Sequence, residues 1–103
     1  MITEVVLFRL PEGMTREQVV GSFKSSAPMW REPAELVRKY YLYDGAQGGG
    51  VYLWTSRAAA EQWHGQAFRE RIRARFGSEP TFAYYESPVI VDNATGEIVT
   101  DAA

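Results

Sequence analysis

The stretch that decides the fold spans residues 48–76 and reads GGGVYLWTSRAAAEQWHGQAFRERIRARF. The three glycines are followed by a short aromatic run, Val51 to Trp54, which is typical of a β-strand. Ser56 follows, and a serine at this point suits a helix N-cap because its side chain can accept a hydrogen bond from the first turn. An alanine-rich segment comes next. The stretch therefore predicts a strand that leads through a short polar turn into a helix.

The predicted helix carries two apolar faces in succession. The first face consists of Ala60, Trp63 and Ala67, and the second, rotated from it, consists of Phe68, Ile72 and Phe76. Gly65 lies between the two sets, and glycine suits a left-handed C-terminal cap. We therefore expect two short helices or one bent helix, with the break at Gly65 and the end at Gly77.

The residues before this stretch predict a strand, a helix and a second strand. The run from Ile2 to Leu10 is apolar and short, which favours a strand. Thr15 with Gln18 three positions later forms a capping-box pattern, and Pro28 should kink or end the helix that follows. Residues 35–43 alternate imperfectly between apolar and polar, so both faces of this strand should be at least partly buried. A turn over residues 44–49 then makes a hairpin with the strand at 51–54.

The residues after the stretch predict one more strand and a tail. Residues 81–91 read as a strand interrupted at Pro88, which indicates an edge position or a bulge because proline lacks an amide hydrogen. Residues 89–103 form a C-terminal hairpin or an arm that crosses to a partner. The whole order is strand, helix, strand, strand, helix, strand within a single domain, residues 1–103. This order predicts an α+β, ferredoxin-like fold with an antiparallel sheet and both helices on one side.

Composition limits the kinds of partner. The formal charge of −2 over 103 residues argues against nucleic acid or an anionic membrane as a partner. The absence of cysteine excludes disulfides and thiolate chemistry. The N-terminus lacks the basic start of a signal peptide, and no apolar stretch approaches the ~20 residues of a membrane span, so we expect a cytoplasmic protein. Both faces of the central strands are apolar, which predicts a homodimer that packs sheet against sheet.

Four short segments resemble the dimeric α+β barrel superfamily, and within it the small mono-oxygenase-like proteins of the YdhR-like branch. They are Arg31-Glu32-Pro33, the tyrosine-rich strand after it, residues 49–56 (GGVYLWTS), and Trp63-His64-Gly65. The last two are similar to a Trp-x-Ser turn and a helical histidine in antibiotic-biosynthesis mono-oxygenases. The haem-degrading branch is a poor match, because its strand-one asparagine and its later helical histidine are both missing here.

The resemblance implies a function and a mechanism. Some members oxidise small phenolic, polycyclic or polyketide-like molecules with oxygen and without a metal or an organic cofactor. The substrate lies in a cleft between sheet and helices of each protomer. A deprotonated phenol or enol can itself pass an electron to oxygen, so the protein has to supply an aromatic pocket, a base and exclusion of water. Two other classes stay open, namely a non-catalytic small-molecule binding protein and a structural or regulatory dimer.

The candidate site residues each carry a second interpretation. His64 is the only side chain with an ordinary pKa suited to proton transfer near neutrality, yet it also suits a helix C-terminus, where a cation is favoured. A lone histidine excludes a multi-histidine metal site. Trp54, Tyr52, Trp30 and Tyr85 would shape the pocket for an aromatic ligand, or else belong to the core or dimer interface. The four arginines at 69, 71, 73 and 75 are read as a solvated helix face in preference to a binding patch.

Overall fold

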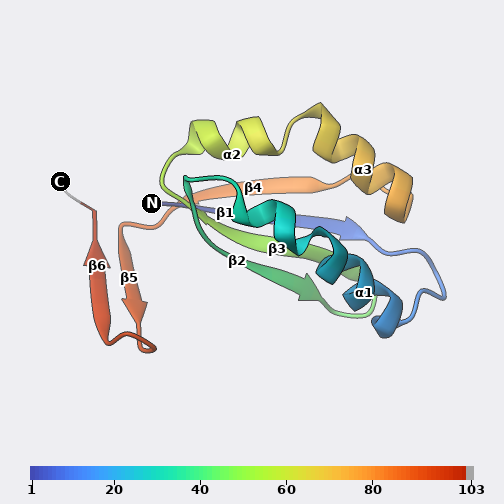
Figure 1. The fold of residues 1–103 in the computed structure, drawn as a ribbon, viewed down its shortest axis with the longest axis horizontal. Helices are drawn as coiled ribbons and strands as arrows, with labels where there is room; N and C mark the ends of the chain where they lie inside the picture. The colour runs from blue at the N-terminus through green and yellow to red at the C-terminus, as the bar shows by residue number, and fades with distance from the viewer. Residues whose placement is uncertain (102–103) are drawn as a thin grey trace.

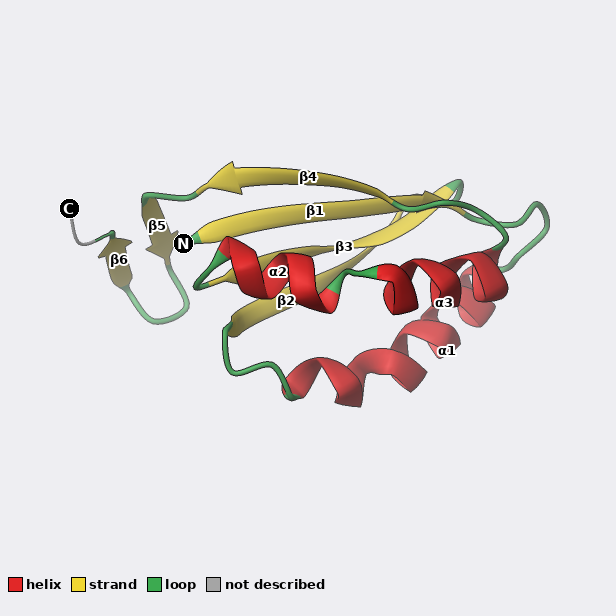
Figure 2. Ribbon diagram, turned by 90° about the horizontal axis from the view of Figure 1, so that it is seen from above, coloured by secondary structure: helices red, strands yellow, loops and turns green. Residues whose placement is uncertain are grey.

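The computed structural model describes residues 1–101 as six strands and four helical segments. In chain order these are β1 (Ile2–Arg9), α1 (Arg16–Ser26), the 3-10 helix η1 (Ala27–Arg31), β2 (Leu36–Tyr43), β3 (Gln47–Trp54), α2 (Arg57–Trp63), α3 (Gln66–Phe76), β4 (Thr81–Glu86), β5 (Val89–Asp92) and β6 (Glu97–Thr100). The first four strands form an antiparallel sheet in the order β2-β3-β1-β4. Helices α1, α2 and α3 lie on one side of this sheet (Figures 1 and 2). The predicted α+β, ferredoxin-like fold is confirmed.

Local sequence signals determine where α1 begins and ends. The Thr15 hydroxyl accepts a hydrogen bond from the Gln18 amide at 3.2 Å, and the Gln18 side chain accepts one from the Thr15 amide at 2.9 Å. This is the predicted capping box. The α-helix ends at Ser26, and Pro28 lies in the first turn of η1, where its missing amide hydrogen costs little. The tighter 3-10 segment then carries Trp30 into the core.

The predicted break between α2 and α3 is confirmed, but the expected conformation of Gly65 is wrong. Gly65 has φ −78° and serves as the N-cap of α3, so it is not a left-handed cap. The C-cap of α2 is His64, whose amide donates to the Ala60 carbonyl at 3.0 Å. The chain leaves α2 and enters α3 without a left-handed residue. Gly77, at φ 74°, does end α3 in the left-handed conformation.

Gly48 and Gly49 belong to β3, together with Gly50, and not to the turn that the sequence predicted over residues 44–49. They pair with Val6, Leu7 and Phe8 of β1. A β-carbon on Gly48 would lie 3.1 Å from side-chain atoms of Leu10 and Phe8, and one on Gly49 would overlap the Val6 carbonyl oxygen. The missing side chains therefore let the core pack directly over the strand.

The predicted strand over residues 81–91 is two strands in different sheets. β4 ends at Glu86, and β5 pairs with β6 in a separate hairpin that lies beyond one end of the main sheet (Figure 1). Pro88 lies between them, where it needs no ladder hydrogen bond. The predicted C-terminal hairpin is thus present over residues 89–100, while 102–103 lie outside the described residues. That it crosses to a partner stays a prediction.

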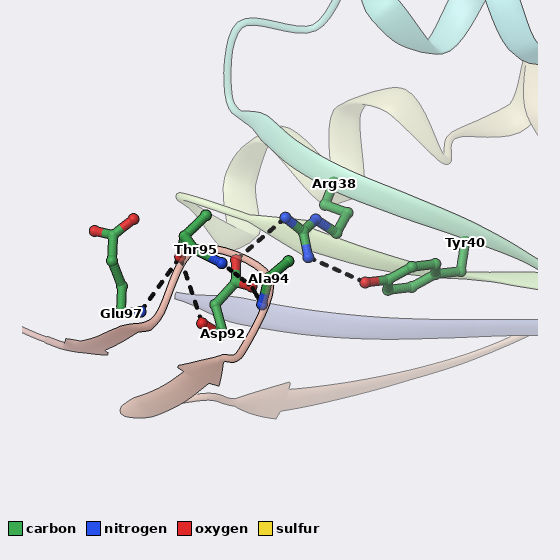
Figure 3. Close-up of polar contacts among 6 residues, drawn as sticks. All are labelled: Arg38, Tyr40, Asp92, Ala94, Thr95 and Glu97. Carbon is green, nitrogen blue, oxygen red and sulfur yellow. Dashed lines mark hydrogen bonds and ion pairs between the residues drawn. The ribbon is translucent and has the colours of Figure 1, made fainter.

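One arginine ties the hairpin to the sheet. Arg38 of β2 donates to the Tyr40 hydroxyl at 3.1 Å and to the Asp92 carboxylate at 3.3 Å (Figure 3). Asp92 in turn accepts the Ala94 amide at 3.0 Å inside the hairpin turn. The hydrogen bond from the Ala94 amide, together with Arg38, lowers the pKa of Asp92. The contacts are exposed, so they orient the hairpin more than they stabilise it.

The sheet has one covered face and one open face. Side chains on the covered face include Glu4, Val6 and Phe8 of β1 with Tyr52 and Trp54 of β3, and all five are buried. Their neighbours in sequence point to the open face, which the helices do not cover (Figure 2). Within residues 1–101, the helices are too short and too polar for any of them to cross a membrane.

Candidate functional site

His64 points into the core and meets a buried carboxylate. Its Nδ1 lies 2.7 Å from Oε1 of Glu4, and the Trp54 indole donates a hydrogen bond to the same oxygen at 2.9 Å. Glu4 is 0% exposed and His64 is 3% exposed. The end of α2 delivers the histidine, while neighbouring strands β1 and β3 deliver Glu4 and Trp54. We call these three residues the Glu4 cluster.

Aromatic rings enclose the imidazole of His64. The ring centroids of Tyr52 and Phe68 lie 4.5 Å from it, and that of Trp30 lies 5.2 Å away. Phe82 completes the shell at 5.7 Å. Both ring nitrogens of His64 and Oε2 of Glu4 are buried and make no aligned hydrogen bond among residues 1–101, so the Nδ1–Oε1 approach is a close polar contact.

The surroundings favour an uncharged imidazole. Burial lowers the pKa of His64, and this effect outweighs the hydrogen bond to Glu4, which raises it. In the neutral tautomer that carries its hydrogen on Nδ1, beside Glu4, Nε2 is a free acceptor. Burial, followed by the Glu4 carboxylate, raises the pKa of Tyr84 to about 12, so this phenol beside the cluster keeps its proton.

A cavity of about 240 Å³ lies next to the cluster, between the sheet and helices α1 and α3. Its wall is mostly apolar and aromatic, which is usual for small-molecule sites. The lining residues are Val6, Phe8, Ser22, Phe23, Ser25, Ser26, Met29, Lys39, Tyr41, Gly49, Tyr52, Arg71, Ile72, Arg75 and Phe76. The volume is close to the lower end of the range for ligand pockets, roughly 300–1,000 Å³.

Lys39 of β2 brings an amine to this cavity. Its Nζ lies over three aromatic rings, 3.8 Å from the centroid of Tyr41, 4.4 Å from Trp30 and 4.5 Å from Tyr52. Burial lowers the pKa of Lys39 to about 7. The ring faces favour the cation and oppose this effect. Both protonation states of the amine are therefore present near neutral pH.

Tyr52 separates the cavity from the Glu4 cluster. One side of its ring lines the cavity below Lys39, and the ring also meets His64 nearly at right angles, with an interplanar angle of 81°. Burial raises the pKa of the Tyr52 phenol well above its ordinary value. His64 itself is not part of the cavity wall.

The structure brings together four of the five residues that the sequence singled out. His64, Trp54, Tyr52 and Trp30 form one contiguous aromatic group on the covered face. Tyr85 lies on the open face and is 59% exposed, apart from this group. Its sequence neighbour Tyr84 points to the covered face, because adjacent strand residues point in opposite directions.

Two residues of the site, Glu4 and Lys39, did not emerge from the sequence. Glu4 interrupts an otherwise apolar strand at a position that shares the covered face with Val6 and Phe8. A charged residue with core-facing parity is the signal that could have found it. Lys39 shares its face with Tyr41, and the same reasoning applies. For Lys39 the parity is harder to read, because β2 has an irregularity between Leu36 and Arg38.

Residues 1–101 contain no obvious cluster of metal ligands. No three histidine, aspartate or glutamate side chains among them gather closely enough to hold a metal ion. The ionisable groups at the core of the covered face include one carboxylate, one imidazole and one amine, surrounded by phenols and indoles, and two arginines of α3 line the cavity beside them. Such a set can accept, hold and donate protons.

Comparisons with known proteins place the fold. No protein-family model and no curated protein matches the sequence. Among solved structures, a protein of unknown function from Nitrosomonas europaea, NE2512, is similar with a TM-score of 0.68 and 16% identity over 84% of this chain and 87% of the other. An asparagine-to-alanine mutant of SnoaB, a cofactor-independent oxygenase from Streptomyces nogalater, is similar with a TM-score of 0.61 and 15% identity over 84% and 91%. At these identities, the similarity establishes a shared fold.

Proposed function

We propose that this protein is a cofactor-independent mono-oxygenase that oxidises a small phenolic, enolic or polyketide-like aromatic molecule. The observation that carries the proposal is an aromatic cavity into which a half-buried amine, Lys39, projects. The fold shared with SnoaB, an oxygenase of this class, supports it. The predicted YdhR-like branch and the cytoplasmic location belong to the same proposal.

The chemistry needs a proton acceptor and a dry pocket. Removal of a proton from the phenol or enol gives an anion rich enough in electrons to reduce oxygen by one electron. The substrate radical and superoxide then combine, and the resulting peroxide takes up a proton and loses water. One CH₂ group and one O₂ become one C=O group and one H₂O, so the substrate supplies all the electrons.

Lys39 is the group that we place at the proton. Its amine faces the cavity, and near neutral pH a fraction of it is unprotonated and free to act as a base. Its protonated form could later return the proton to the peroxide. The aromatic walls from Tyr41, Trp30 and Tyr52 would hold a planar substrate against it.

The sequence-based role of His64 as proton acceptor stays as the alternative. Glu4 orients its imidazole, and Nε2 is a free acceptor, as in other carboxylate-oriented bases. A substrate would reach Nε2 only if Tyr52 moved, because this ring stands between His64 and the cavity. The two candidates therefore predict different responses to substitution.

We also propose the homodimer. The open face presents apolar side chains of the central strands, among them Val5, Leu7, Val51 and Leu53, and Tyr40 is 54% exposed there. Two such faces could cover each other. Sedimentation should give about twice the 11.6 kDa chain mass, and Val51→Glu should shift the protein toward monomer. A wild-type protein that stays monomeric at micromolar concentration would contradict this part of the proposal.

Oxygen uptake tests the function. Metal-free protein is mixed with a panel of phenols, quinols and anthrones, and uptake is recorded for wild type, Lys39→Met and His64→Gln. We expect wild-type uptake to need the protein, and Lys39→Met to lower the rate by about 10²-fold or more, which is a usual contribution from a general base. Lys24→Met, a change at the exposed lysine of α1, is the matched control.

The outcomes separate the candidates. Uptake lost in His64→Gln and kept in Lys39→Met would move the proton acceptor to His64. No uptake by wild type with any compound, while one or more of them binds, would replace the enzyme with a small-molecule binding protein.

A further inference from the structure

The four arginines of α3 are divided between two environments. Arg73 pairs with Glu79 at 2.9 Å, and the Arg69 guanidinium stacks over the Phe82 ring at 4.7 Å. Arg71 and Arg75 are also exposed, but they line the cavity as well. Since side chains four positions apart share a helix face, these two lie one turn apart along the cavity wall.

The two cavity arginines have no carboxylate partner among residues 1–101. Neither Arg71 nor Arg75 is in an ion pair there, and Arg75 makes a hydrogen bond of 3.2 Å to the Ser22 hydroxyl. Within the same residues, Lys39 faces the same space and also has no paired carboxylate. The cavity thus gathers three basic side chains and, among its lining residues, no acidic one.

This local charge is opposite to that of the chain. The protein as a whole has a formal charge of −2, so the basic cavity does not follow from an overall excess of arginine and lysine. Basic groups that line a partly enclosed, low-dielectric space attract anions more strongly than the same groups on an open surface. Guanidinium groups in particular match the planar geometry of a carboxylate or the oxygens of a phosphate.

We infer that the ligand of this cavity is an aromatic molecule bearing a compact anionic group, a carboxylate or a phosphate, which lies against Arg71 and Arg75 and leaves the Lys39 amine to the proton of the ring system. The ring system would occupy the apolar part of the wall, near Phe23 and Phe76. The inference deepens the proposed function and rests on it for the cavity as the substrate site. A volume of about 240 Å³ equals roughly eight water molecules at ~30 Å³ each, which suits one or two fused rings.

A matched series of naphthalene compounds tests the inference by calorimetry. 1-Naphthoate and 1-naphthyl phosphate carry the two anionic groups, 1-naphthalenemethanol is neutral, and 1-naphthalenemethylamine is cationic. None of them is a phenol or an enol under the assay conditions, so binding is measured without turnover. Each compound is titrated at low and high salt into wild type, Arg71→Gln, Arg75→Gln and the control Arg73→Gln, which changes an arginine already paired with Glu79.

We expect at least one anionic compound to bind about tenfold more tightly than the neutral alcohol at low salt, and the advantage to shrink at high salt. Arg71→Gln and Arg75→Gln should each reduce this preference about fivefold, because each removes a partly exposed ion pair. Arg73→Gln should leave it unchanged. The preferred anion tells carboxylate from phosphate.

Three results would overturn the inference: equal or tighter binding of the alcohol or the amine, a preference that survives in both cavity-arginine variants, or no binding of any compound. These results are separate from the oxygenase test. Anion-selective binding by a protein that takes up no oxygen would leave the inference standing and remove the proposed reaction. Oxygen uptake with neutral phenols alone would support the proposed reaction and remove the inference that the ligand carries an anionic group.

Discussion

The Glu4 cluster and Lys39 lie on the same face of the sheet, on either side of Tyr52, and their surroundings differ. The Glu4 cluster is sealed by aromatic rings, with Glu4 0% exposed and His64 3% exposed. Lys39 opens onto a cavity of about 240 Å³. Burial shifts the pKa of both His64 and Lys39, so a shifted pKa alone does not mark a binding site. The two sites differ in that Lys39 has a cavity beside it and His64 does not.

The largest expected effect comes from removing the carboxylate of the Glu4 cluster. Glu4→Ala leaves the Trp54 indole and the His64 imidazole without their shared partner in a dry core. We expect a loss of about 3–5 kcal/mol in the free energy of unfolding, as is typical when one partner of a buried pair is removed. Urea unfolding measures it, with Glu86→Ala at the exposed end of β4 as control. Equal, small losses in both variants would show that the cluster is not a structural unit.

A smaller effect should appear as coupling between Glu4 and His64 in the free energy of unfolding. Glu4→Leu leaves His64 without its carboxylate, and His64→Phe leaves Glu4 with only the Trp54 indole of the cluster, whereas the double variant replaces both with apolar groups. The double variant should therefore be more stable than the sum of the single losses predicts, by about 2 kcal/mol. A double-mutant cycle in urea gives this number, and strict additivity would argue against the Glu4–His64 contact.

Replacing the cavity lysine should act in the opposite direction. The pKa of Lys39 is about 7 in the folded protein and near its ordinary value of 10.5 when unfolded, so below pH 7 the fold carries the full cost of a half-buried cation. Lys39→Met should raise the stability by about 1 kcal/mol at pH 6.5, or about 5 °C in Tm, and this gain should disappear at pH 9.5, where less of the cost of the cation remains. Thermal unfolding at the two pH values checks this, and an equal or larger gain at pH 9.5 would contradict the lowered pKa.

The smallest expected effect is the pH dependence that His64 contributes. Its pKa is lower in the folded state than in the unfolded state, so the unfolded chain takes up the proton first as the pH falls. This contribution to stability is complete above pH 6.5 and declines as the pH drops toward the folded pKa. The groups that face His64 and influence it are Glu4, Lys39 and Arg71.

The comparison for this prediction is the Glu4→Leu, His64→Phe double variant, which lacks the titrating imidazole. Its stability should change less than that of wild type between pH 6.5 and pH 5.5. Parallel curves for the two proteins would mean that His64 titrates alike in the folded and unfolded states.

The fold could be predicted because its signals are local. The capping box at Thr15, the change of apolar face at Gly65 and the left-handed Gly77 each depend on a few neighbouring residues. The errors arose where tertiary packing decides. The sequence predicts Gly49 in a turn, yet it pairs with β1 as part of β3, at a position where a side chain would overlap the Val6 carbonyl. The split between β4 and β5 likewise depends on which strand each finds as a partner.

The candidate site was harder to predict because its groups meet across strands. Trp54, Tyr52 and Trp30 could be grouped with His64 as aromatic residues, but the carboxylate that holds the imidazole comes from 60 positions earlier in the chain. Tyr84 and Tyr85 are adjacent residues of the same type. Only their pairing with β1 shows that Tyr84 points to the covered face and Tyr85 to the open face. Burial lowers the pKa of Lys39, and the residues that bury it come from several elements, so no local pattern reveals the shift.

Titration of the lysine side chains by carbon NMR tests the central claim most directly, namely that a proton acceptor projects into the cavity. The chain has two lysines, Lys24 and Lys39, so labelling the ε-carbons gives two signals that Lys39→Met assigns. We predict that the Lys39 signal has its midpoint near pH 7 and shifts when 1-naphthoate is added. A midpoint near the ordinary lysine value of about 10.4, unaffected by the naphthoate, would contradict the account.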